Sequence, residues 1–398
     1  MLKGKTILLG VSGSIAAYKI ASLASMLVKQ HADVHVIMTE NATNFINPIT
    51  FETLTGNKCL VDTFDRNFEF QVEHVSLAKR TDIALVAPAS ANVIGKMAHG
   101  IADDMLTTTL LACKAPILVS PAMNTNMYEN PVVQDNLCTL QAYGMKVIAP
   151  ADGYLACGDT GAGKMPEPEI LFAHIEAAIA CEKDLAGKRV LVTAGATQEA
   201  LDPVRYLTNH STGKMGYAIA KAAMLRGAQV TLVSAPTNLT PPLCVDMVPI
   251  VSAQDMYEAV ESRFDDADIL IMAAAVADYR PMEFVDHKIK KKDGDNTLLL
   301  ARTTDILGTI CARKRADQFV CGFSMETDDL ISHSRAKLEK KHLDMIAANN
   351  LRVQGAGFGT ETNVVTLICP DRMTELPLLS KLEVAHRILD HIACKYSM

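Results

Sequence analysis

Arg189-Val-Leu-Val-Thr-Ala194, followed by the polar loop of residues 195–216, is the stretch that decides the fold. Its apolar, β-branched residues predict a short buried strand. After the loop, residues 217–226 have helical spacing, and Gly227 is a helix stop signal. A strand, a polar loop and a helix N-terminus form a site for an anion, because free backbone N–H groups and the helix dipole face the ligand. The alternative is an ordinary surface loop, but long loops in compact α/β domains are uncommon and usually functional.

The first part of the chain repeats this plan. Residues 6–11 are strand-like, the turn Ser12-Gly-Ser14 follows, and residues 15–29 carry an apolar stripe at helical spacing before a strand at 34–38. Further strand candidates cover residues 83–87, 117–120, 146–149, 229–234, 269–273, 319–323 and 364–369. Strands that alternate with helices predict an α/β fold with two doubly wound, Rossmann-like units and mostly parallel sheets. Ligands then lie beyond the carboxyl ends of the strands.

A charged link separates the two halves. It covers residues 182–188, where a helical run ends and the next strand begins. Domain boundaries fall in such exposed, polar segments. We therefore expect a first domain over residues 1–184 and a second over residues 185–398.

Composition narrows the class of protein. The chain has 398 residues, a formal net charge of −7 and ten cysteines. The negative charge argues against a general nucleic-acid binder. The cysteines are scattered without a C-x-x-C pair or zinc-like spacing, which indicates reduced thiols and predicts a cytoplasmic protein. The first residues enter a strand directly, which predicts no signal peptide, and no apolar run is long enough for a membrane span.

Hydroxyl and glycine residues follow three predicted strands of the first half. The turn with Gly13 and Ser14 could bind one phosphate through backbone N–H groups and hydroxyls. Thr39 and Ser90 each closely follow a predicted strand and could add hydroxyl groups. No G-x-G-x-x-G sequence occurs here, which counts against NAD and FAD.

Three further side chains of the first half are candidates for chemistry. Asn124, in Pro121-Ala-Met-Asn-Thr-Asn-Met127, offers a donor and an acceptor that suit a carboxylate or amide, although a capping turn would also use it. Cys157 lies in a glycine-rich stretch, which predicts a mobile loop and a thiol free to react. His74 is a lone histidine, and on pattern alone such a residue is more often structural than catalytic.

The second half contains small residues and lysines after its strands. Ala273-Ala-Ala-Val-Ala-Asp-Tyr-Arg280 allows close approach of a ligand, with Asp278 as the charged group at its tip. Lys288-Ile-Lys-Lys-Lys292 is either a solvated face or a site for a triphosphate. Lys337 and Lys341 are four residues apart and share one helix face.

These motifs resemble two enzyme families. In the second half, Asp202-Pro-Val-Arg205, Asn209 and Ser211-Thr-Gly-Lys-Met-Gly216 resemble the signature of phosphopantothenate–cysteine ligase. In the first half, Glu73-His-Val75, the P-A-M-N-x-x-M motif and the segment around Cys157 resemble phosphopantothenoylcysteine decarboxylase. Together they are similar to the bifunctional coenzyme A biosynthesis flavoproteins over nearly the whole chain.

For the first half, the resemblance implies an FMN-dependent decarboxylase. It implies that FMN is bound by Gly13, Ser14, Thr39 and Ser90. It implies that His74 is an active-site residue and that Cys157 is the proton donor. It also implies that Asn124 is catalytic, and that Asn124 and Met127 bind the substrate. The flavin oxidises the cysteine thiol of the substrate to a thioaldehyde, which can accept the charge left when carbon dioxide departs.

For the second half, the resemblance implies amide formation between 4′-phosphopantothenate and L-cysteine, driven by CTP with Mg²⁺. Lys288 would stabilise the charge that develops while the carboxylate is activated, and Asn209 would act on the acyl-cytidylate intermediate. The nucleotide-binding residues it implies are Ala273, Ala275, Asp278, Lys288, Asp305, Ile306, Phe323, Lys337 and Lys341. One departure is Thr303-Thr304, where the family usually has Asn-Pro; a threonine there could cap a helix.

The resemblance also bears on partners and alternatives. It implies a homo-oligomer, with trimeric contacts between first domains, dimeric contacts between second domains and possibly a dodecamer. A dehydrogenase of the same fold class is disfavoured because G-x-G-x-x-G is absent. The remaining alternative is a flavin-binding regulatory protein of the same family with reduced activity.

Overall fold

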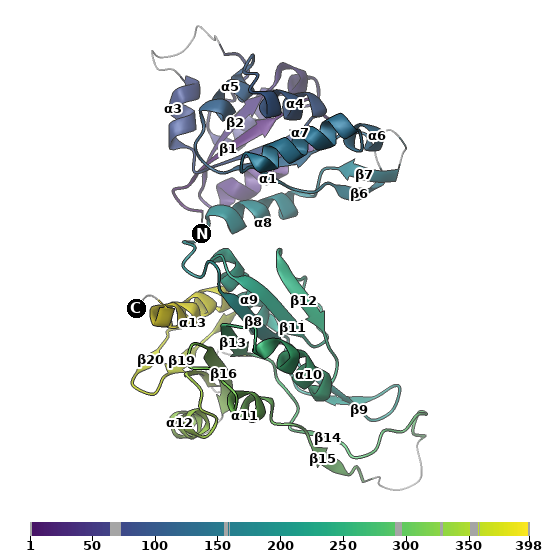
Figure 1. Ribbon diagram of the computed structural model, residues 1–398, viewed down its shortest axis with the longest axis vertical. Helices are drawn as coiled ribbons and strands as arrows, with labels where there is room; N and C mark the ends of the chain where they lie inside the picture. Colours follow the sequence, from purple (N-terminus) through teal and green to yellow (C-terminus); the bar gives the residue numbers. More distant parts are fainter. Residues whose placement is uncertain are drawn as a thin grey trace. The chain divides into compact units, whose positions relative to one another are not determined.

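The computed structural model describes residues 2–63, 73–154, 158, 160–290, 297–326, 329–350, 357 and 359–396. The chain divides into two compact units, Met1–Cys181 and Glu182–Met398. Each unit has its own sheet (Figure 1), and each is described by itself.

Unit 1 contains a sheet of five parallel strands in the order β2-β1-β3-β4-β5. This 2-1-3-4-5 order is that of the flavodoxin-like doubly wound fold. Its strands are β1 (Thr6–Val11), β2 (Asp33–Met38), β3 (Ile83–Ala89), β4 (Ile117–Pro121) and β5 (Lys146–Val147), with the hairpin β6 (Ala151–Tyr154) and β7 (Thr160–Lys164) beside them. Its helices are α1 (Ala17–Lys29), η1 (Glu40–Asn44), α2 (Pro48–Thr55), α3 (Glu73–Arg80), α4 (Ala91–His99), α5 (Met105–Ala112), α6 (Thr125–Tyr128), α7 (Pro131–Ala142) and α8 (Pro168–Ile179).

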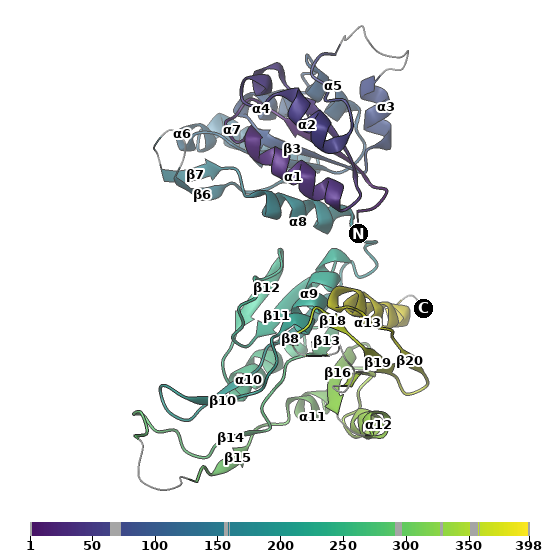
Figure 2. The same cartoon turned by 180° about the vertical axis from the view of Figure 1, so that it is seen from behind.

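The buried side chains of unit 1 form one core on each face of the sheet. Ile7 and Leu9 of β1 pack into the core under α1, α2 and α8, whereas Leu8 packs into the core under α3, α4, α5 and α7. Successive side chains of a strand point to opposite faces, so an uninterrupted apolar strand supplies both cores. Figure 2 shows α2 beside α1 on the first of these faces.

Unit 2 contains an eight-stranded sheet in the order β12-β11-β8-β13-β16-β17-β19-β20. The first six strands are parallel, and β19 and β20 are antiparallel additions. In chain order the parallel part reads 3-2-1-4-5-6, the order of the Rossmann fold. Its strands are β8 (Arg189–Ala194), β11 (Gln229–Ser234), β12 (Val245–Pro249), β13 (Ile269–Met272), β16 (Phe319–Glu326), β17 (Met345–Asn350), β19 (Val365–Ile368) and β20 (Met373–Glu375). The predicted fold class is confirmed.

The remaining elements of unit 2 cover the sheet or extend from its edge. Helices α9 and α13 pack against each other (Figure 1), with α9 on β8 and β11, while α10, α11 and α12 contribute to the core with β13 and β16. The helices are α9 (Lys214–Leu225), α10 (Ala253–Phe264), α11 (Ile306–Cys311), α12 (Leu330–Lys340) and α13 (Lys381–Tyr396). The short strand pairs are β9 (Gln198–Ala200) with β10 (Tyr206–Thr208), β14 (Tyr279–Pro281) with β15 (Leu300–Arg302), and β18 (Thr362–Asn363) with β21 (Leu379–Ser380).

Glycines allow α9 to approach β8 closely. A Cβ atom on Gly216 would lie 2.6 Å from the Cβ of Ala194 and 2.7 Å from the carbonyl oxygen of Thr193. Gly213, just before the helix, has a φ of 80°, a left-handed conformation that favours glycine. These two glycines of the loop of residues 195–216 are therefore required by the backbone conformation, and they allow the N-terminus of α9 to lie over the end of β8.

Local structure differs from the sequence-based expectation in several places. The loop of residues 195–216 is not irregular throughout, because it contains the hairpin β9–β10. Strands β12 and β17 were not predicted: β12 is partly exposed, and β17 ends in polar Asn349 and Asn350, so neither is a purely apolar run.

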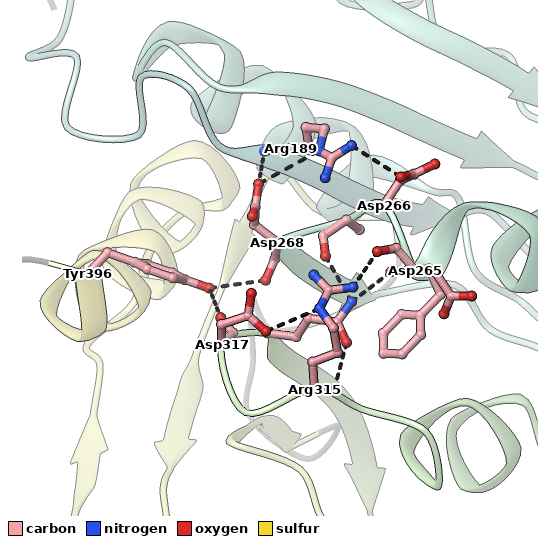
Figure 3. A network of polar contacts seen from close by, with 10 residues as sticks. Arg189, Asp265, Asp266, Asp268, Arg315, Asp317 and Tyr396 are labelled. Atoms are coloured by element: carbon pink, nitrogen blue, oxygen red, sulfur yellow. Dashed lines mark hydrogen bonds and ion pairs between the residues drawn. The ribbon is translucent and has the colours of Figure 1, made fainter.

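A polar network joins the amino ends of the central strands of unit 2 to the end of α13 (Figure 3). The backbone N–H of Arg189 donates to Asp268 Oδ2 at 2.7 Å. The hydroxyl of Tyr396 donates to the carbonyl oxygens of Asp268 and Asp317, at 3.0 and 3.2 Å. This network therefore stabilises the end of the sheet opposite to the loops that carry the predicted ligand residues. None of the described helices is both long and apolar enough to span a membrane.

Candidate functional site

Two loops of unit 1 are joined by one buried hydroxyl group, and a third is joined to them by a backbone hydrogen bond. Ser12, directly after β1, donates from Oγ to the carbonyl oxygen of Pro88 at 2.6 Å and accepts from the backbone N–H of Ser90 at 2.9 Å. The backbone N–H of Thr39, after β2, donates to the carbonyl oxygen of Val11 at 2.9 Å. The loops with Gly13, Ser14, Thr39 and Ser90 therefore meet at the carboxyl ends of three adjacent strands.

This meeting point fits a phosphate group. A Cβ atom on Gly13 would lie 2.8 Å from the Cβ of Asn41, so only glycine lets the turn pass this close. The Ser14 hydroxyl accepts from the N–H of Ala16 just before α1, and Ser90 caps α4, so two helix N-termini converge here. Within the part of the chain that the structure describes, the buried Thr39 Oγ1 has no hydrogen-bond partner. A buried hydroxyl of this kind needs a partner, which a bound anion would supply.

A cavity of about 550 Å³ extends from this loop to the β6–β7 hairpin. Ser14 and Asn124 both line it, together with Tyr154, Gly163 and Lys164 of the hairpin. Asn124 also caps α6, because its Oδ1 accepts from the N–H of Asn126 at 2.9 Å. Both interpretations of Asn124 from sequence are thus compatible, since it caps a helix and lines a cavity.

The other predicted residues of unit 1 lie elsewhere or are not described. His74 is half-buried in the first turn of α3 and is not among the residues that line this cavity. Met127, in α6, is 48% exposed and also does not line it. Cys157 lies outside the described residues. The roles predicted for these three residues stay predictions.

In unit 2 the loops after β8 and β13 are joined by hydrogen bonds. The N–H of Ala275 donates to the carbonyl oxygen of Gly195 at 2.9 Å, and the N–H of Ala277 donates to Thr197 Oγ1 at 2.9 Å. Asn209 Nδ2 donates to the carbonyl oxygen of Ala275 at 3.3 Å. Asn209 and Ala275 therefore lie together at the point where the strand order reverses, the usual ligand position of such sheets.

A second cavity, of about 430 Å³, lies beside these loops. Most predicted nucleotide-binding residues line it, namely Asp278, Asp305, Ile306, Phe323, Lys337 and Lys341. The predicted residues Ala273, Ala275 and Lys288 are not among its lining residues. Sequence reasoning missed the contribution of Tyr279 and Arg302, which belong to the short strands β14 and β15, for which the sequence shows no recognisable pattern.

Both lysines of the second cavity have polar partners. Lys341 Nζ lies 2.8 Å from Asp305 Oδ1, and Lys337 Nζ donates to the carbonyl oxygen of Phe323 at 2.8 Å. Burial tends to raise the pKa of Asp305, but hydrogen bonds from Lys341 and from the N–H of Gly308 together lower it below its usual value. Asp305 is therefore an anion. It could compete with a bound triphosphate for a cationic side chain, or it could bind a cation that accompanies the triphosphate.

The departure at Thr303-Thr304 has a local explanation. Both threonines line the second cavity. Thr303 Oγ1 donates to the carbonyl oxygen of Ala277 at 2.6 Å, and its N–H donates to that of Asp278 at 3.0 Å. The helix cap expected of a threonine is instead made by Asp305, whose Oδ1 accepts from Gly308 N–H at 3.1 Å. The threonines therefore fix the loop that carries Asp278.

Asp202 clamps the segment that carries Lys288. Its side chain is fully buried, and its Oδ1 accepts from the N–H groups of Val204 and Arg205 at 2.9 and 2.8 Å. Its Oδ2 accepts from Arg205 Nε at 3.0 Å and from the N–H of Ile289 at 3.1 Å. Arg205 Nη2 donates in turn to the carbonyl oxygen of Ile289 at 3.0 Å. Arg205 above all, aided by the backbone donors against the effect of burial, holds the pKa of Asp202 well below its usual range.

Comparison with known proteins defines the class. Residues 1–180 match the family model described as Flavoprotein, and residues 185–395 match the model described as DNA/pantothenate metabolism flavoprotein C-terminal domain. The chain is therefore a pantothenate metabolism flavoprotein.

Relatives of nearly the same length are more specific. A coenzyme A biosynthesis bifunctional protein of Bacillus subtilis is 49% identical over 397 residues, which cover 99% of this chain and 98% of the relative. One of Vibrio vulnificus is 46% identical and covers 98% of each chain. The solved C-terminal domain of another such protein is 44% identical over 54% of this chain and 99% of that chain, with a TM-score of 0.47. The chain belongs to the family of bifunctional coenzyme A biosynthesis proteins, enzymes with a ligase part and a decarboxylase part.

The Asp202 clamp predicts a selective loss of ligase activity in Asp202→Asn. The amide NH₂ of asparagine would face the N–H donors of Arg205 and Ile289, so the Lys288 segment would lose its anchor. We expect ligase kcat to fall roughly 10- to 100-fold, the range for loss of a charge-assisted hydrogen bond, with a smaller change in KM. Decarboxylation by the same protein should be unchanged.

The matched control is Asp286→Asn. Asp286 lies in the same segment, but its side chain is 92% exposed and forms its ion pair with the neighbouring His287. It should keep wild-type ligase activity. Equal ligase activity in Asp202→Asn and wild type would show that the clamp does not position Lys288.

Proposed function

We propose that the chain makes 4′-phosphopantetheine from 4′-phosphopantothenate, L-cysteine and CTP in two steps. Unit 2 joins the carboxylate to the amine of cysteine, and unit 1 removes the carboxylate of the joined cysteine. The observation that carries this proposal is that each unit has its own ligand-sized cavity beside loops that follow its strands. The cavity of unit 2 is lined by Arg302, Lys337 and Lys341 together with two aspartates, and that of unit 1 extends from the turn at Ser14 to the amide of Asn124.

In unit 2, the second cavity would take CTP. Arg302, Lys337 and Lys341 offer cationic groups to the triphosphate, and Phe323 offers an aromatic face to the base. Mg²⁺ would arrive with the nucleotide, because this ion is usually held by phosphates and one or two carboxylates, here Asp278 and Asp305. The metal ligands stay a proposal.

Two residues outside that cavity would act on the acyl group. Lys288, exposed on its clamped segment, would move over the reacting carboxylate and stabilise charge as pyrophosphate leaves. Asn209, beside the carbonyl group of Ala275, would hold the acyl-cytidylate while the amine of cysteine attacks. This division assigns Lys288 to activation and Asn209 to the following step.

In unit 1, the turn with Gly13 and Ser14, together with Thr39 and Ser90, would bind the phosphate of FMN. When bound, FMN supplies the oxidation of the substrate thiol and the later return of hydride. Asn124 would orient the carboxylate, His74 would act in the oxidation step, and Cys157 would return a proton to the product. A regulatory role has no observation in its favour. A homo-oligomer and a cytoplasmic location stay predictions.

Lys288→Gln tests the ligase assignment. Loss of the cationic group should abolish release of pyrophosphate from CTP in the presence of 4′-phosphopantothenate, while decarboxylation of added phosphopantothenoylcysteine stays at the wild-type rate. Lys340→Gln is the matched control, because Lys340 is exposed on α12 and does not line the second cavity. Normal pyrophosphate release by Lys288→Gln would contradict the role given to this lysine.

Thr39→Val tests the flavin site. Valine keeps the shape of threonine but cannot donate to a phosphate, so FMN affinity should fall roughly tenfold or more, as for other hydrogen bonds to charged groups. Flavin released by heat and identified by chromatography should be FMN. Thr53→Val is the control, since Thr53 Oγ1 donates to the carbonyl oxygen of Ile49 within α2. Unchanged FMN affinity in Thr39→Val, or FAD in the wild type, would refute this site.

A further inference from the structure

We propose that Glu199 positions Asn209 for the second step of the ligase reaction. Glu199 lies on β9 of the hairpin β9–β10, and Asn209 is the first residue after β10. Because Glu199 would act through Asn209 and not on the substrate, it is a positioning residue. The inference rests on the proposed function, in which Asn209 holds the acyl-cytidylate, and it extends that function by identifying what fixes Asn209 in place.

The carboxylate of Glu199 occupies a buried position. Only 4% of this residue is exposed, whereas Gln198 and Ala200 on the same strand are half-buried and exposed. Glu199 Oε1 accepts from the backbone N–H of Ala253 at 2.9 Å, and Ala253 is the first residue of α10. Burial of a carboxylate is costly, but a helix N-terminus offers free N–H groups and the positive end of the helix dipole. The hydrogen bond to α10 therefore explains why a carboxylate can lie here.

Helix α10 does not depend on Glu199 for its own cap. Ser252 and Asp255 form a complete capping box: Ser252 Oγ accepts from the N–H of Asp255 at 3.1 Å, and Asp255 Oδ2 accepts from the N–H of Ser252 at 2.8 Å. The apolar face of the helix is also fixed, because Met256 and Val260 are fully buried in the core of unit 2. The contact of Glu199 therefore serves the hairpin, which it joins to an element that is held independently.

The hairpin needs such an anchor. Strands β9 and β10 pair through only three residues each, and a two-stranded hairpin is at best marginally stable by itself. Besides the contact of Glu199, the backbone N–H of Gln198 donates to the carbonyl oxygen of Val251, just before α10, at 2.9 Å. Figure 1 shows β9 beside α10. Glu199 supplies the side-chain part of this anchor, which a substitution can remove.

The anchored end of the hairpin is the end that leads into Asn209. In the register of the hairpin, Glu199 lies opposite Leu207, two residues before Asn209. Asn209 Nδ2 donates to the carbonyl oxygen of Ala275, in the loop after β13, at 3.3 Å. A shift of β9 is therefore passed through the strand pair to Asn209, and it moves the amide of Asn209 relative to Ala275.

The other end of the hairpin serves the other residue of the reaction. There Asp202, in the turn between the two strands, accepts from the N–H of Ile289 and holds the segment that carries Lys288. The turn thus positions Lys288, which we assign to activation, whereas the base of the hairpin positions Asn209, which we assign to the following step. Loss of Glu199 should therefore affect a different step from loss of Asp202.

The test measures the two steps separately in the full-length protein. Release of pyrophosphate from CTP with 4′-phosphopantothenate and Mg²⁺ reports activation. Decay of the acyl-cytidylate after addition of L-cysteine, followed by rapid quenching and mass spectrometry, reports the second step. We expect Glu199→Ala to release pyrophosphate at the wild-type rate in its first turnover. Its second step should be roughly 10- to 100-fold slower, because a misplacement of about 1 Å can cost that much, and the acyl-cytidylate should accumulate.

Three variants complete the design. Glu199→Gln keeps an oxygen that can accept from Ala253, so its second step should stay close to the wild-type rate. Asp255→Ala is the stability control: it removes half of the capping box and destabilises α10, but it leaves Glu199 and Ala253 in place, so both steps should run normally. Glu199→Asp, whose carboxylate is one methylene too short to reach Ala253, should show the defect of Glu199→Ala and replaces it if the alanine variant does not fold.

Coupling to Asn209 distinguishes positioning from a general structural role. Asn209→Ala alone should slow the second step. Adding Glu199→Ala to that variant should slow the step no further, because the group that Glu199 positions is already absent. Additive losses would show that Glu199 acts independently of Asn209, and they would overturn the inference.

The remaining outcomes are separable. A slow second step in Glu199→Ala, with a normal one in Glu199→Gln, supports the inference. An unchanged second step in Glu199→Ala, loss of pyrophosphate release in that variant, or the same defect in Asp255→Ala overturns it. Failure of the wild type to form the acyl-cytidylate at all overturns the proposed function instead.

Discussion

Parallel pairing of the central strands is the constraint on which both sites depend. In unit 1, β1 pairs with β2 and β3, and in unit 2, β8 pairs with β11 and β13. Parallel strands end at the same edge, so their loops must meet there. Hydrogen bonds then lock the loops together, through Ser12 in unit 1 and through the backbone of Gly195 and Ala275 in unit 2. Side chains distant in sequence become neighbours because of this shared edge.

Each cavity contains polar side chains that suit its proposed reaction. Activation of a carboxylate by a nucleotide involves several phosphate charges, and the cavity of unit 2 offers Arg302, Lys337 and Lys341 to them. Loss of carbon dioxide requires a carboxylate that is oriented without being strongly stabilised, which the amide of Asn124 provides.

Local sequence patterns predicted the fold class, and the resemblance to a known family implied six of the residues that line the second cavity. The predicted strand at 229–234 has the same bounds as β11, since an apolar run between polar loops is unambiguous. The Asp202 clamp could not be predicted, because its partner Ile289 is 87 residues away along the chain. The lysine-rich pattern around Lys288 indicated a nucleotide site. The position of Lys288 relative to the second cavity depends on the tertiary structure of its segment, which a local pattern does not specify.

The central claim is that two units of one chain perform consecutive reactions. The most direct measurement supplies the purified protein with 4′-phosphopantothenate, L-cysteine, CTP and Mg²⁺, and quantifies pyrophosphate, carbon dioxide and 4′-phosphopantetheine in the same sample. The account predicts that all three appear in equal amounts at completion, because each turnover of unit 2 supplies one substrate molecule to unit 1. Pyrophosphate and phosphopantothenoylcysteine without carbon dioxide, or no pyrophosphate at all, would contradict it.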